Sequence, residues 1–338
     1  MADLKGGGAG NRMPETGLCH CGKEPAVFLH YAQKHLCEGH FIRMFDKRFR
    51  KTLSAHKMLK KGDRVAIGLS GGKDSTVLLH SLAELRKDLP FDIVALTIDE
   101  GIKGYRARTL TIAKKECDRL GIEQVVLSFD KETGKTLDEA MACGKKGSDE
   151  EGPATLPCTH CGVLRRYLLN KGARMVKATK LALGHNLDDM AQTVLMNIMR
   201  NEPARLARLN EPVMKSDRFV RRIRPLMLSP ERENAIYAMM KGIDIEHVEC
   251  PYARYAFRSH IRKMLNDTEV RYPGTKFKVV NAFFDMEEGL RTQFGKARQL
   301  NECSSCGEPC SGSVCMFCRM IAPVRQKRAG RRFPDSAI

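Results

Sequence analysis

The chain has 338 residues, 42% of them hydrophobic, and its 58 Lys and Arg against 40 Asp and Glu give a formal net charge of +18. The length exceeds that of one typical domain, and the hydrophobic content suffices for a sizeable core. No apolar stretch approaches the ~20 residues that span a bilayer, so the charge favours a polyanion partner, and nucleic acid before a membrane surface. A basic surface that only maintains solubility is the alternative.

The N-terminal segment, residues 1–17, contains three consecutive glycines and no apolar core of signal-peptide length. We expect a disordered lead-in and a cytoplasmic location. In a reducing compartment the 13 cysteines argue against a disulfide framework, so we interpret their spacing as that of metal sites.

The first cysteine group lies in residues 18–50, which we predict to be a zinc module. Cys19 and Cys21 precede Cys37 and His40, a set of thiol and imidazole ligands that suits tetrahedral zinc. The Cys19-x-Cys21 spacing is one residue shorter than the usual Cys-x2-Cys spacing. The first ligand therefore stays open between Cys19 and His20.

A strand-turn-helix pattern follows. The apolar, β-branched segment 64–69 predicts a buried strand, and apolar residues at helical spacing predict a helix over 74–86. Between them, Gly71 and Gly72 allow a sharp turn and close approach to a ligand, while the amide groups and dipole at the helix start favour an anion. Lys73 adds a positive charge. An ordinary glycine turn that caps a helix is the alternative.

The turn reads Ser-Gly-Gly-Lys-Asp-Ser, which differs from the Walker pattern. It resembles the PP-loop of ATP pyrophosphatases, enzymes that adenylate a carbonyl oxygen and release pyrophosphate. The resemblance implies an ATP site at Leu69, Ser70, Gly71, Gly72, Lys73, Asp74 and Ser75.

Apolar segments and helical periodicity alternate through the centre of the chain. Strands are predicted at 64–69, 92–99, 124–129 and 180–184, and helices at 74–86, 106–120, 136–142, 160–178 and 189–199. This order indicates an α/β fold with a doubly wound parallel sheet, in which ligands bind beyond the carboxyl ends of the strands. We predict that it forms a catalytic domain over residues 51–250.

The ends of two strands carry further ATP candidates. After the second strand, the backbone of Ile98 is placed to contact an adenine ring, although Asp99 and Gly101 also suit an ordinary strand-end turn. After the fourth strand, we add Gly184 and Asp189 to the ATP set.

Helix capping competes with a catalytic interpretation after the fourth strand. Asn186 and Asp188 could cap the helix that follows. Capping accounts for one acid but does not require two beside His185. Asp189 is therefore interpreted as a contact to Mg²⁺ or ATP.

Two polar regions are harder to interpret. The loop 144–157 has little apolar content and is predicted to be a flap over the site, with an idle surface insertion equally compatible. A group of arginines, together with the basic tail at 323–338, indicates a phosphate-tracking surface, with a solvated basic face as the alternative. These arginines are Arg200, Arg205, Arg208, Arg218, Arg221, Arg222 and Arg224.

Cys158 and Cys161 form a pair with no second pair nearby, and Cys250 is the best candidate for a distant partner. Three cysteines make an incomplete shell for structural zinc but suit a [4Fe-4S] cluster with one iron open to another ligand. Direct redox or persulfide chemistry by the thiols is one alternative, and a buried structural role for Cys250 is another.

The C-terminal cysteines predict a second zinc site. After a helical connecting region at 251–300, expected also to bind RNA, a ribbon at 301–322 contains the ligands Cys303, Cys306, Cys315 and Cys318 in two Cys-x2-Cys pairs. Cys310 is interpreted as a surplus thiol that could replace Cys306.

The ordered set of motifs, from the first cysteine module to the last Cys-x2-Cys pair, resembles the tRNA 2-thiouridine synthetases of the TtuA type, in the PP-loop ATP pyrophosphatase superfamily. In that family ATP adenylates the C2 oxygen of a tRNA uridine, and sulfur then replaces the adenylate. The resemblance implies that Cys158, Cys161 and Cys250 hold the cluster, whose open iron receives the sulfur.

The same resemblance implies catalytic roles for Asp189, Lys73 and Arg165. Relatives often have Lys at the position of Arg165. Because arginine does not readily lose its proton, Arg165 could stabilise charge but would be a poor base.

The resemblance also implies ATP with Mg²⁺, two Zn²⁺, a tRNA substrate, a possible homodimer, and sulfur from a ubiquitin-like thiocarboxylated carrier or from inorganic sulfide. It leaves open whether the wobble or the T-loop uridine is modified. The alternatives are a PP-loop amidotransferase that uses ammonia, a tRNA 2-thiocytidine synthetase, and a nonenzymatic zinc-ribbon RNA-binding protein. The flanking zinc modules favour the uridine enzymes.

Overall fold

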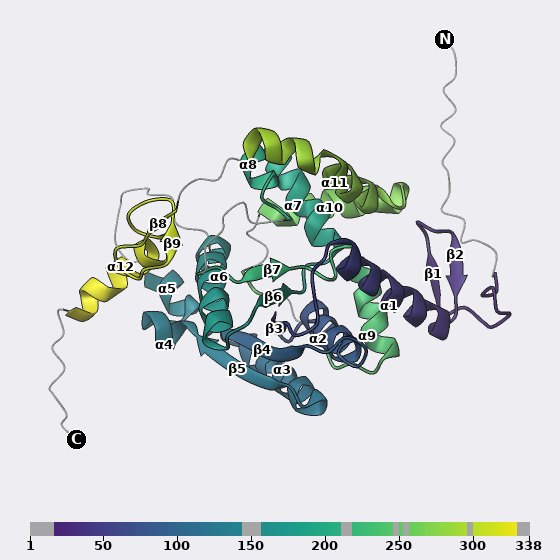
Figure 1. Ribbon diagram of the computed structural model, residues 1–338, viewed down its shortest axis with the longest axis horizontal. Coiled ribbons are helices and arrows are strands. Elements are labelled where there is room, and N and C mark those ends of the chain that lie inside the picture. Colours follow the sequence, from purple (N-terminus) through teal and green to yellow (C-terminus); the bar gives the residue numbers. More distant parts are fainter. Residues whose placement is uncertain are drawn as a thin grey trace, which may run out of the picture.

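The computed structural model describes residues 17–143, 157–210, 218–245, 250–252, 257–295 and 300–329. The lead-in before Gly17, the predicted flap up to residue 156 and the basic tail from residue 330 lie outside the described residues. The two cysteine modules lie at opposite ends of the molecule, with the central sheet between them (Figure 1).

The central sheet has five parallel strands in the order β5-β4-β3-β6-β7. The predicted doubly wound α/β fold is confirmed, and each of the four predicted strands is found to within one residue at either end. They are β3 (Arg64–Gly68), β4 (Asp92–Asp99), β5 (Glu123–Ser128) and β6 (Lys180–Leu183).

The fifth strand, β7 (Arg221–Ile223), was not predicted. It lies at the sheet edge and pairs only with β6, with Ile223 buried. Two of its three residues are arginines, so no apolar run marks it in the sequence, and its structure depends on pairing with β6.

The helices around the sheet follow the prediction closely. They are α2 (Lys73–Leu85), α3 (Arg106–Leu120), α5 (Leu137–Cys143), α6 (Pro157–Met175) and α7 (Leu187–Met199), with an unpredicted short helix α4 (Phe129–Thr133). The predicted range 160–178 for α6 was wrong by three residues at each end. Proline suits the first helical position, and Lys177 has a φ of 54°, which ends the helical geometry.

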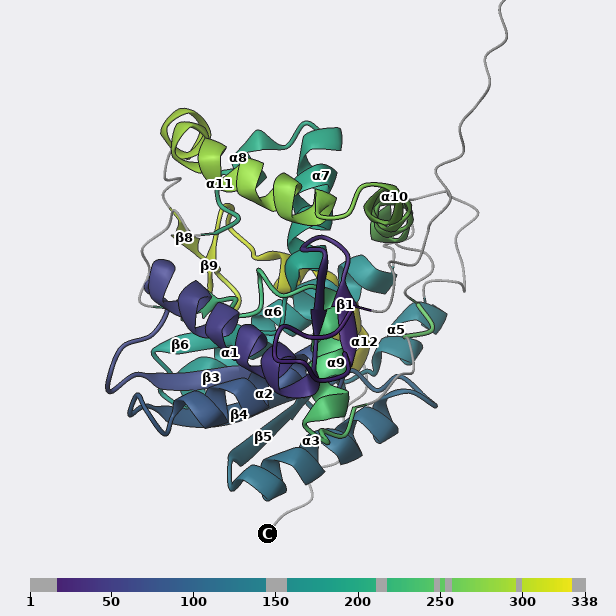
Figure 2. The same cartoon turned by 90° about the vertical axis from the view of Figure 1, so that its right-hand side faces the viewer.

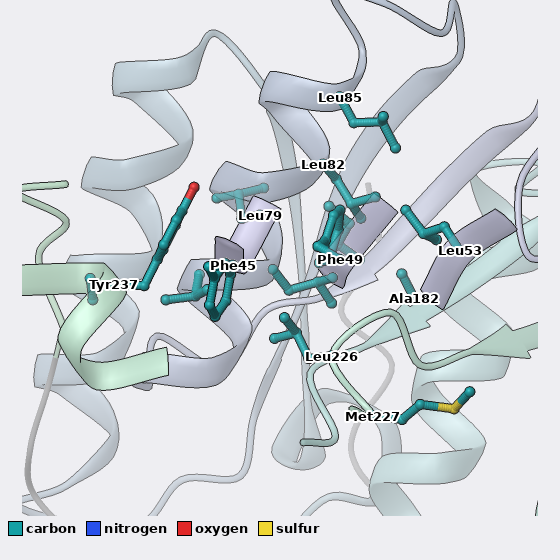
Figure 3. Close-up of a cluster of buried hydrophobic side chains, with 14 of the residues drawn as sticks. Phe45, Phe49, Leu53, Leu79, Leu82, Leu85, Ala182, Leu226, Met227 and Tyr237 are labelled. Carbon is teal, nitrogen blue, oxygen red and sulfur yellow. The ribbon is translucent and has the colours of Figure 1, made fainter. Parts of the chain in front are cut away.

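A phenylalanine-rich helix covers one face of the sheet. In α1 (Glu38–Ala55), Phe41, Phe45 and Phe49 recur every four residues and are buried. The Phe45 ring stacks on Tyr237 of α9 (Glu231–Met240) with ring centroids 4.1 Å apart (Figure 3). Burial of each phenylalanine contributes about 2 kcal/mol, so this contact fixes α1 and α9 beside α2.

Elements from both chain ends extend this core. The hairpin of β1 (Val27–Leu29) and β2 (Lys34–Leu36) precedes α1. The helices α8 (Pro203–Leu206), α10 (Phe257–Arg271) and α11 (Thr275–Phe294) gather with α7 on one side of the molecule, away from β5 and α3 (Figure 2).

The C-terminal module contains β8 (Asn301–Glu302), β9 (Pro309–Cys310) and α12 (Met316–Ala329). It packs on α6, where the rings of Tyr167 and Phe317 stack with centroids 3.6 Å apart and an interplanar angle of 4°. Glu308 forms an ion pair with Arg174. Among the described residues, no helix is long and apolar enough to cross a membrane.

Candidate active site and metal centres

The glycine turn after β3 has a conformation that requires glycine. Gly71 has a φ of +82°, and a Cβ atom at this position would lie 2.0 Å from the carbonyl oxygen of Thr109 in α3. The turn therefore rests directly on the first turns of α3. Gly72 is the N-cap residue of α2, so the loop ends where the amide groups of the helix begin.

Serine hydroxyls hold the turn from inside. The Ser75 hydroxyl donates to the carbonyl oxygen of Gly72 at 2.9 Å and lies 2.9 Å from the Ser70 hydroxyl. The amide of Ser70 donates to the Ser75 oxygen, and the amide of Gly72 donates to the Ser70 oxygen. Both serines thus shape the anion-binding turn.

Lys73 begins α2 and has two carboxylate partners. Its Nζ lies 2.5 Å from Glu231 Oε1 and 3.3 Å from Asp74 Oδ2. Burial alone would lower the pKa of Lys73, but the two carboxylates outweigh burial and raise it. Asn234 donates to Asp74 at 2.6 Å, which fixes that carboxylate. Lys73 is therefore a protonated side chain that two carboxylates fix at the start of α2.

A cavity of about 510 Å³ opens above this turn. It brings together most of the predicted ATP residues from three strand ends, together with Glu100, Arg106, Arg165 and His185. The predicted residues in its wall are Leu69, Ser70, Gly72, Lys73, Asp74, Ser75, Ile98 and Gly184. Gly71 and Asp189 are not in the wall: Gly71 faces Thr109, and Asp189 lies at the start of α7.

Asp189 is the acid of a capping box. The Asn186 side chain accepts from the Asp189 amide at 2.9 Å, and Asp189 Oδ2 accepts from the Asn186 amide at 3.3 Å. Arg258 lies 3.3 Å from the other carboxylate oxygen. Burial raises the pKa of Asp189 to about 6, although Arg258 opposes the shift.

The neighbouring acid, Asp188, makes different contacts. Asp188 does not cap α7. It accepts from the backbone amide of Glu231 at 2.8 Å and forms an ion pair with Lys276. The expectation that Asp188 caps the helix was wrong, because its carboxylate points toward α9 and α11 while Asn186 supplies the cap.

His185 lines the same cavity and is neutral at physiological pH. Desolvation, together with the charges of nearby arginines, lowers its pKa to about 3. These arginines are Arg224, Arg258, Arg165 and Arg222. The imidazole can therefore accept or donate a hydrogen bond without carrying a charge.

Arg106 is a site residue that the sequence did not reveal. Its buried guanidinium donates to the Ser70 carbonyl at 2.6 Å, to the Thr109 hydroxyl at 2.8 Å and to the Ile98 carbonyl. Glu100 lies 2.8 Å from its Nε. The sequence contained one indication of its role: Arg106 is the first residue of α3, the helix that follows a strand whose end lines the cavity.

The turn after β4, near Arg106, is the ordinary strand-end turn for which Asp99 and Gly101 are suited. Asp99 Oδ1 accepts from the Gly101 amide at 2.9 Å, as turn chemistry predicts. The Ile98 carbonyl already has Arg106 as its partner.

The three cysteines predicted to hold a cluster lie around one end of α6. Cys158 and Cys161 are in its first turns, and the Cys158 thiol lies 3.4 Å from the carbonyl oxygen of Tyr252, two residues after Cys250. All three are partly exposed. Arg165 follows Cys161 by one helical turn and lies 3.3 Å from Glu100 Oε1.

The thiols influence one another. Burial raises the pKa of Cys161 to about 12, where Arg165 acts against the shift while Glu100 and Cys250 add to it. Burial also raises the pKa of Cys250, and the charge of Cys158 adds to it. Thiols in such surroundings stay protonated until a metal displaces the proton.

The N-terminal cysteine group converges on one point. The ligand atoms of Cys19, Cys21, Cys37 and His40 all lie within 4.8 Å of one another. His40 Nδ1 is 3.2 Å from the Cys19 sulfur and 3.3 Å from the Cys37 sulfur. The ring of His20 lies beside that of His40, with centroids 3.9 Å apart and an interplanar angle of 43°, but His20 is not part of this group.

The C-terminal group also converges. The sulfurs of Cys303, Cys306, Cys315 and Cys318 lie within 4.8 Å of one another. The Cys310 thiol instead donates to the Gly312 carbonyl at 2.9 Å. In the part of the chain that the structure describes, these are the two groups of metal-ligating side chains whose ligand atoms all lie within 4.8 Å of one another. The Cys158, Cys161 and Cys250 set is more open, as a cluster larger than one ion requires.

The predicted arginine surface is partly engaged within the protein. Arg218 contacts the C-terminal module through Gly307 and lies 3.4 Å from Glu302, and Arg205 pairs with Glu202 at 3.1 Å. Arg222 sits near Arg166 and Arg224, and burial together with their charges lowers its pKa to about 10. Such crowding of like charge favours an anionic partner.

Comparison with known proteins shows the family. A family model described as "PP-loop domain" matches residues 41–269. The chain is 36% identical over 293 residues to "Cytoplasmic tRNA 2-thiolation protein 1" of Dictyostelium discoideum, a match that covers 85% of this chain and 77% of that protein. It is 32% identical over 299 residues to the "tRNA-5-methyluridine(54) 2-sulfurtransferase" of Pyrococcus horikoshii, covering 88% of this chain and 91% of the relative.

A solved structure agrees. The U34-tRNA thiolase NcsA from Methanococcus maripaludis, with its [4Fe-4S] cluster, has a TM-score of 0.76 and 32% identity over 92% of this chain and 97% of that one. The chain belongs to the PP-loop family of tRNA 2-thiolation proteins.

Membership in the PP-loop tRNA 2-thiolation family confirms the resemblance that the ordered motifs indicated. It supports the uridine interpretation over the ammonia-dependent and 2-thiocytidine alternatives. The names of two relatives specify different tRNA positions, 34 and 54.

Proposed function

We propose that this protein is an ATP-dependent tRNA 2-sulfurtransferase that converts a tRNA uridine into 2-thiouridine. The observation that carries the proposal is a cavity lined by the PP-loop turn, Glu100 and Arg165. Arg165 lies on α6, one helical turn after Cys161. The Pyrococcus relative is named a tRNA 2-sulfurtransferase and the Dictyostelium relative a tRNA 2-thiolation protein, which supports this reaction.

The first half of the reaction activates the base. The uridine C2 oxygen forms a bond to the α-phosphorus of ATP, and the bond to pyrophosphate breaks. We assign the phosphates to the amide groups at the start of α2 and to Lys73, which would exchange Glu231 for phosphate oxygens. Mg²⁺ enters with ATP as part of the substrate.

Asp189 is proposed as the catalytic acid-base residue. Its raised pKa of about 6 leaves most of the carboxylate ionised at neutral pH while keeping it able to exchange a proton. Arg258 and the capping box fix its orientation. Since Asp189 lies outside the cavity wall, it would act at the rim, where the base enters.

In the second half, sulfur forms a bond to C2, and the C–O bond breaks so that AMP leaves with the original oxygen. Water would only regenerate uridine, so the bound substrates have to exclude it from the activated C2. Arg165 remains protonated and would stabilise negative charge near the leaving oxygen.

The chain's donor set fits the predicted [4Fe-4S] cluster. Cys158, Cys161 and Cys250 offer three partly exposed thiols on neighbouring elements, more widely spread than the two zinc groups. Three protein thiolates leave one iron position open, and the bound cluster would supply that position for sulfur. The thiols themselves hold and orient the group beside Arg165.

The two tight cysteine groups are proposed as structural zinc sites. Each presents four ligand atoms in a closed set: three thiols and one imidazole in the N-terminal module, and four thiols in the C-terminal module. A zinc ion in the second would anchor the ribbon that packs on α6. The domain boundaries at 18–50, 51–250, 251–300 and 301–322 remain predictions from the sequence.

We assign the tRNA to the basic face that includes Arg222 and Arg224, beside the cavity. The sulfur donor is proposed to be a thiocarboxylated ubiquitin-like carrier or inorganic sulfide, and a homodimer is proposed as the assembly. The name of the Dictyostelium relative supports the predicted cytoplasmic location.

The test is anaerobic reaction of the iron-loaded protein with ATP, sulfide and unmodified tRNA. Equal amounts of AMP, pyrophosphate and 2-thiouridine are expected. Cys250→Ala should abolish 2-thiouridine while both zinc ions are retained, and Cys310→Ala is the matched control that keeps activity. Full activity of Cys250→Ala would remove Cys250 from the mechanism.

A further inference from the structure

The carboxylate of Glu100 lies between two guanidinium groups that belong to different halves of the site. Its Oε2 is 2.8 Å from Arg106 Nε, and its Oε1 is 3.3 Å from Arg165 Nε. Glu100 is 6% exposed. This carboxylate therefore lies between two cations, and removal of its charge would leave the buried Arg106 guanidinium without its carboxylate partner.

One of these two cations contacts the ATP loop. Arg106 is 3% exposed and donates to the Ser70 carbonyl and the Thr109 hydroxyl. Because Gly71 rests on the Thr109 carbonyl, the loop cannot move relative to α3 without breaking these contacts. Glu100 is thereby tied to the position of the phosphates.

The other cation lies near the cysteines. Arg165 lies one helical turn after Cys161 on α6, and its charge acts on the Cys161 thiol. The backbone carbonyl of Glu100 also accepts from the Leu137 amide at 2.8 Å, which anchors the glutamate itself. One side chain therefore links the ATP loop to the helix that carries Cys161.

We propose that Glu100 is a positioning residue that couples adenylation to sulfur transfer. The inference rests on the proposed function. Without the charge of Glu100, Arg165 loses its carboxylate partner and lies near Arg106, which carries a like charge. The activated C2 is then misaligned with the sulfur, and water competes: its oxygen bonds to C2, AMP leaves, and uridine is regenerated.

The experiment compares Glu100→Gln with wild type in the iron-loaded protein and measures 2-thiouridine formed per AMP released. The wild-type ratio should be close to one, and the variant ratio should fall about fivefold or more because ATP is still consumed. Calorimetry with α,β-methylene-ATP should give a dissociation constant within about threefold of wild type, since the loop contacts of Arg106 remain.

A pair of arginine variants separates coupling from structure. Arg106→Lys keeps the charge but loses the planar fork, so analogue binding, AMP release and thiolation should fall together. Arg108→Lys, at an exposed position of α3, should match wild type in all three.

An unchanged thiolation ratio in Glu100→Gln would overturn the coupling role. A parallel loss of analogue binding and both products would assign Glu100 a merely structural role and also overturn it. If the proposed function is wrong, the wild type itself will form no 2-thiouridine, which distinguishes that outcome from failure of the coupling role.

Discussion

Gly71 and Thr109 are in direct backbone contact: a Cβ atom on Gly71 would lie 2.0 Å from the Thr109 carbonyl oxygen. This contact joins the ATP loop to α3. Glycine is required at position 71 for two reasons: its φ is +82°, and the Thr109 carbonyl leaves no space for a Cβ atom.

The first prediction tests this contact. Gly71→Ala should lower ATP turnover about 100-fold or more, because the loop must move off Thr109 and misplace the phosphates. Gly104 is the matched control: its φ is +73°, but no atom lies within 4 Å of the position that a Cβ would take. Gly104→Ala should cost about 1 kcal/mol of stability and leave turnover within about twofold. Equal turnover in the two variants would show that space at Gly71 is unimportant.

A second prediction concerns the C-terminal module. Phe317→Ala removes a buried ring that stacks on Tyr167 of α6, and should lower the free energy of unfolding by about 3–4 kcal/mol. Met316→Ala, at an exposed neighbouring position, should change it by about 0.5 kcal/mol or less. Chemical denaturation measures both values. A similar small change for both would mean that the ring contact does not anchor the module.

The third prediction is a pH dependence. Because burial raises the pKa of Asp189 to about 6, the carboxyl is protonated below that pH and ionised above it. If the ionised form is the active one, AMP formation should rise with pH and reach half of its maximum near pH 6. Asp189→Asn keeps an oxygen for the Asn186 amide, so it should preserve the cap, while AMP formation falls at every pH and no longer rises near pH 6. The same pH step in this variant would assign the titration to another group.

The fourth prediction addresses tRNA binding. Arg222→Gln should weaken binding about threefold to tenfold and reduce the slope of log K against log salt by about 0.9, as expected for loss of one phosphate contact. The Michaelis constant for ATP should stay unchanged. Arg108→Gln serves as the control on the opposite side of the sheet order, next to β5 rather than β7. An unaltered salt slope for Arg222→Gln would place the RNA elsewhere.

Sequence patterns predicted the parts of this protein that depend on local chemistry. The strand-turn-helix around Gly71 follows from apolar periodicity and glycine, and the two groups of converging cysteine and histidine side chains follow from their spacing. The strand β7 was missed because Arg221 and Arg222 form a strand only by pairing with β6. Tertiary contact supplied what the local pattern lacked.

Long-range polar contacts were also beyond the sequence. Arg106 and Glu231 hold the loop and Lys73, yet each lies in a helix that gives no sign of its partner. The acids after β6 illustrate the same limit. Asp188 was interpreted as a possible cap of the helix, but its carboxylate forms an ion pair with Lys276, which lies 88 residues later in the chain.

The central claim, that this protein inserts sulfur into a tRNA uridine through Cys158, Cys161 and Cys250, is tested most directly by mass spectrometry of tRNA nucleosides from a deletion strain, with positional mapping. The account predicts loss of 2-thiouridine at one position, restored by the wild-type gene and not by Cys250→Ala. An unchanged amount of 2-thiouridine in the deletion strain, or full restoration by Cys250→Ala, would contradict it.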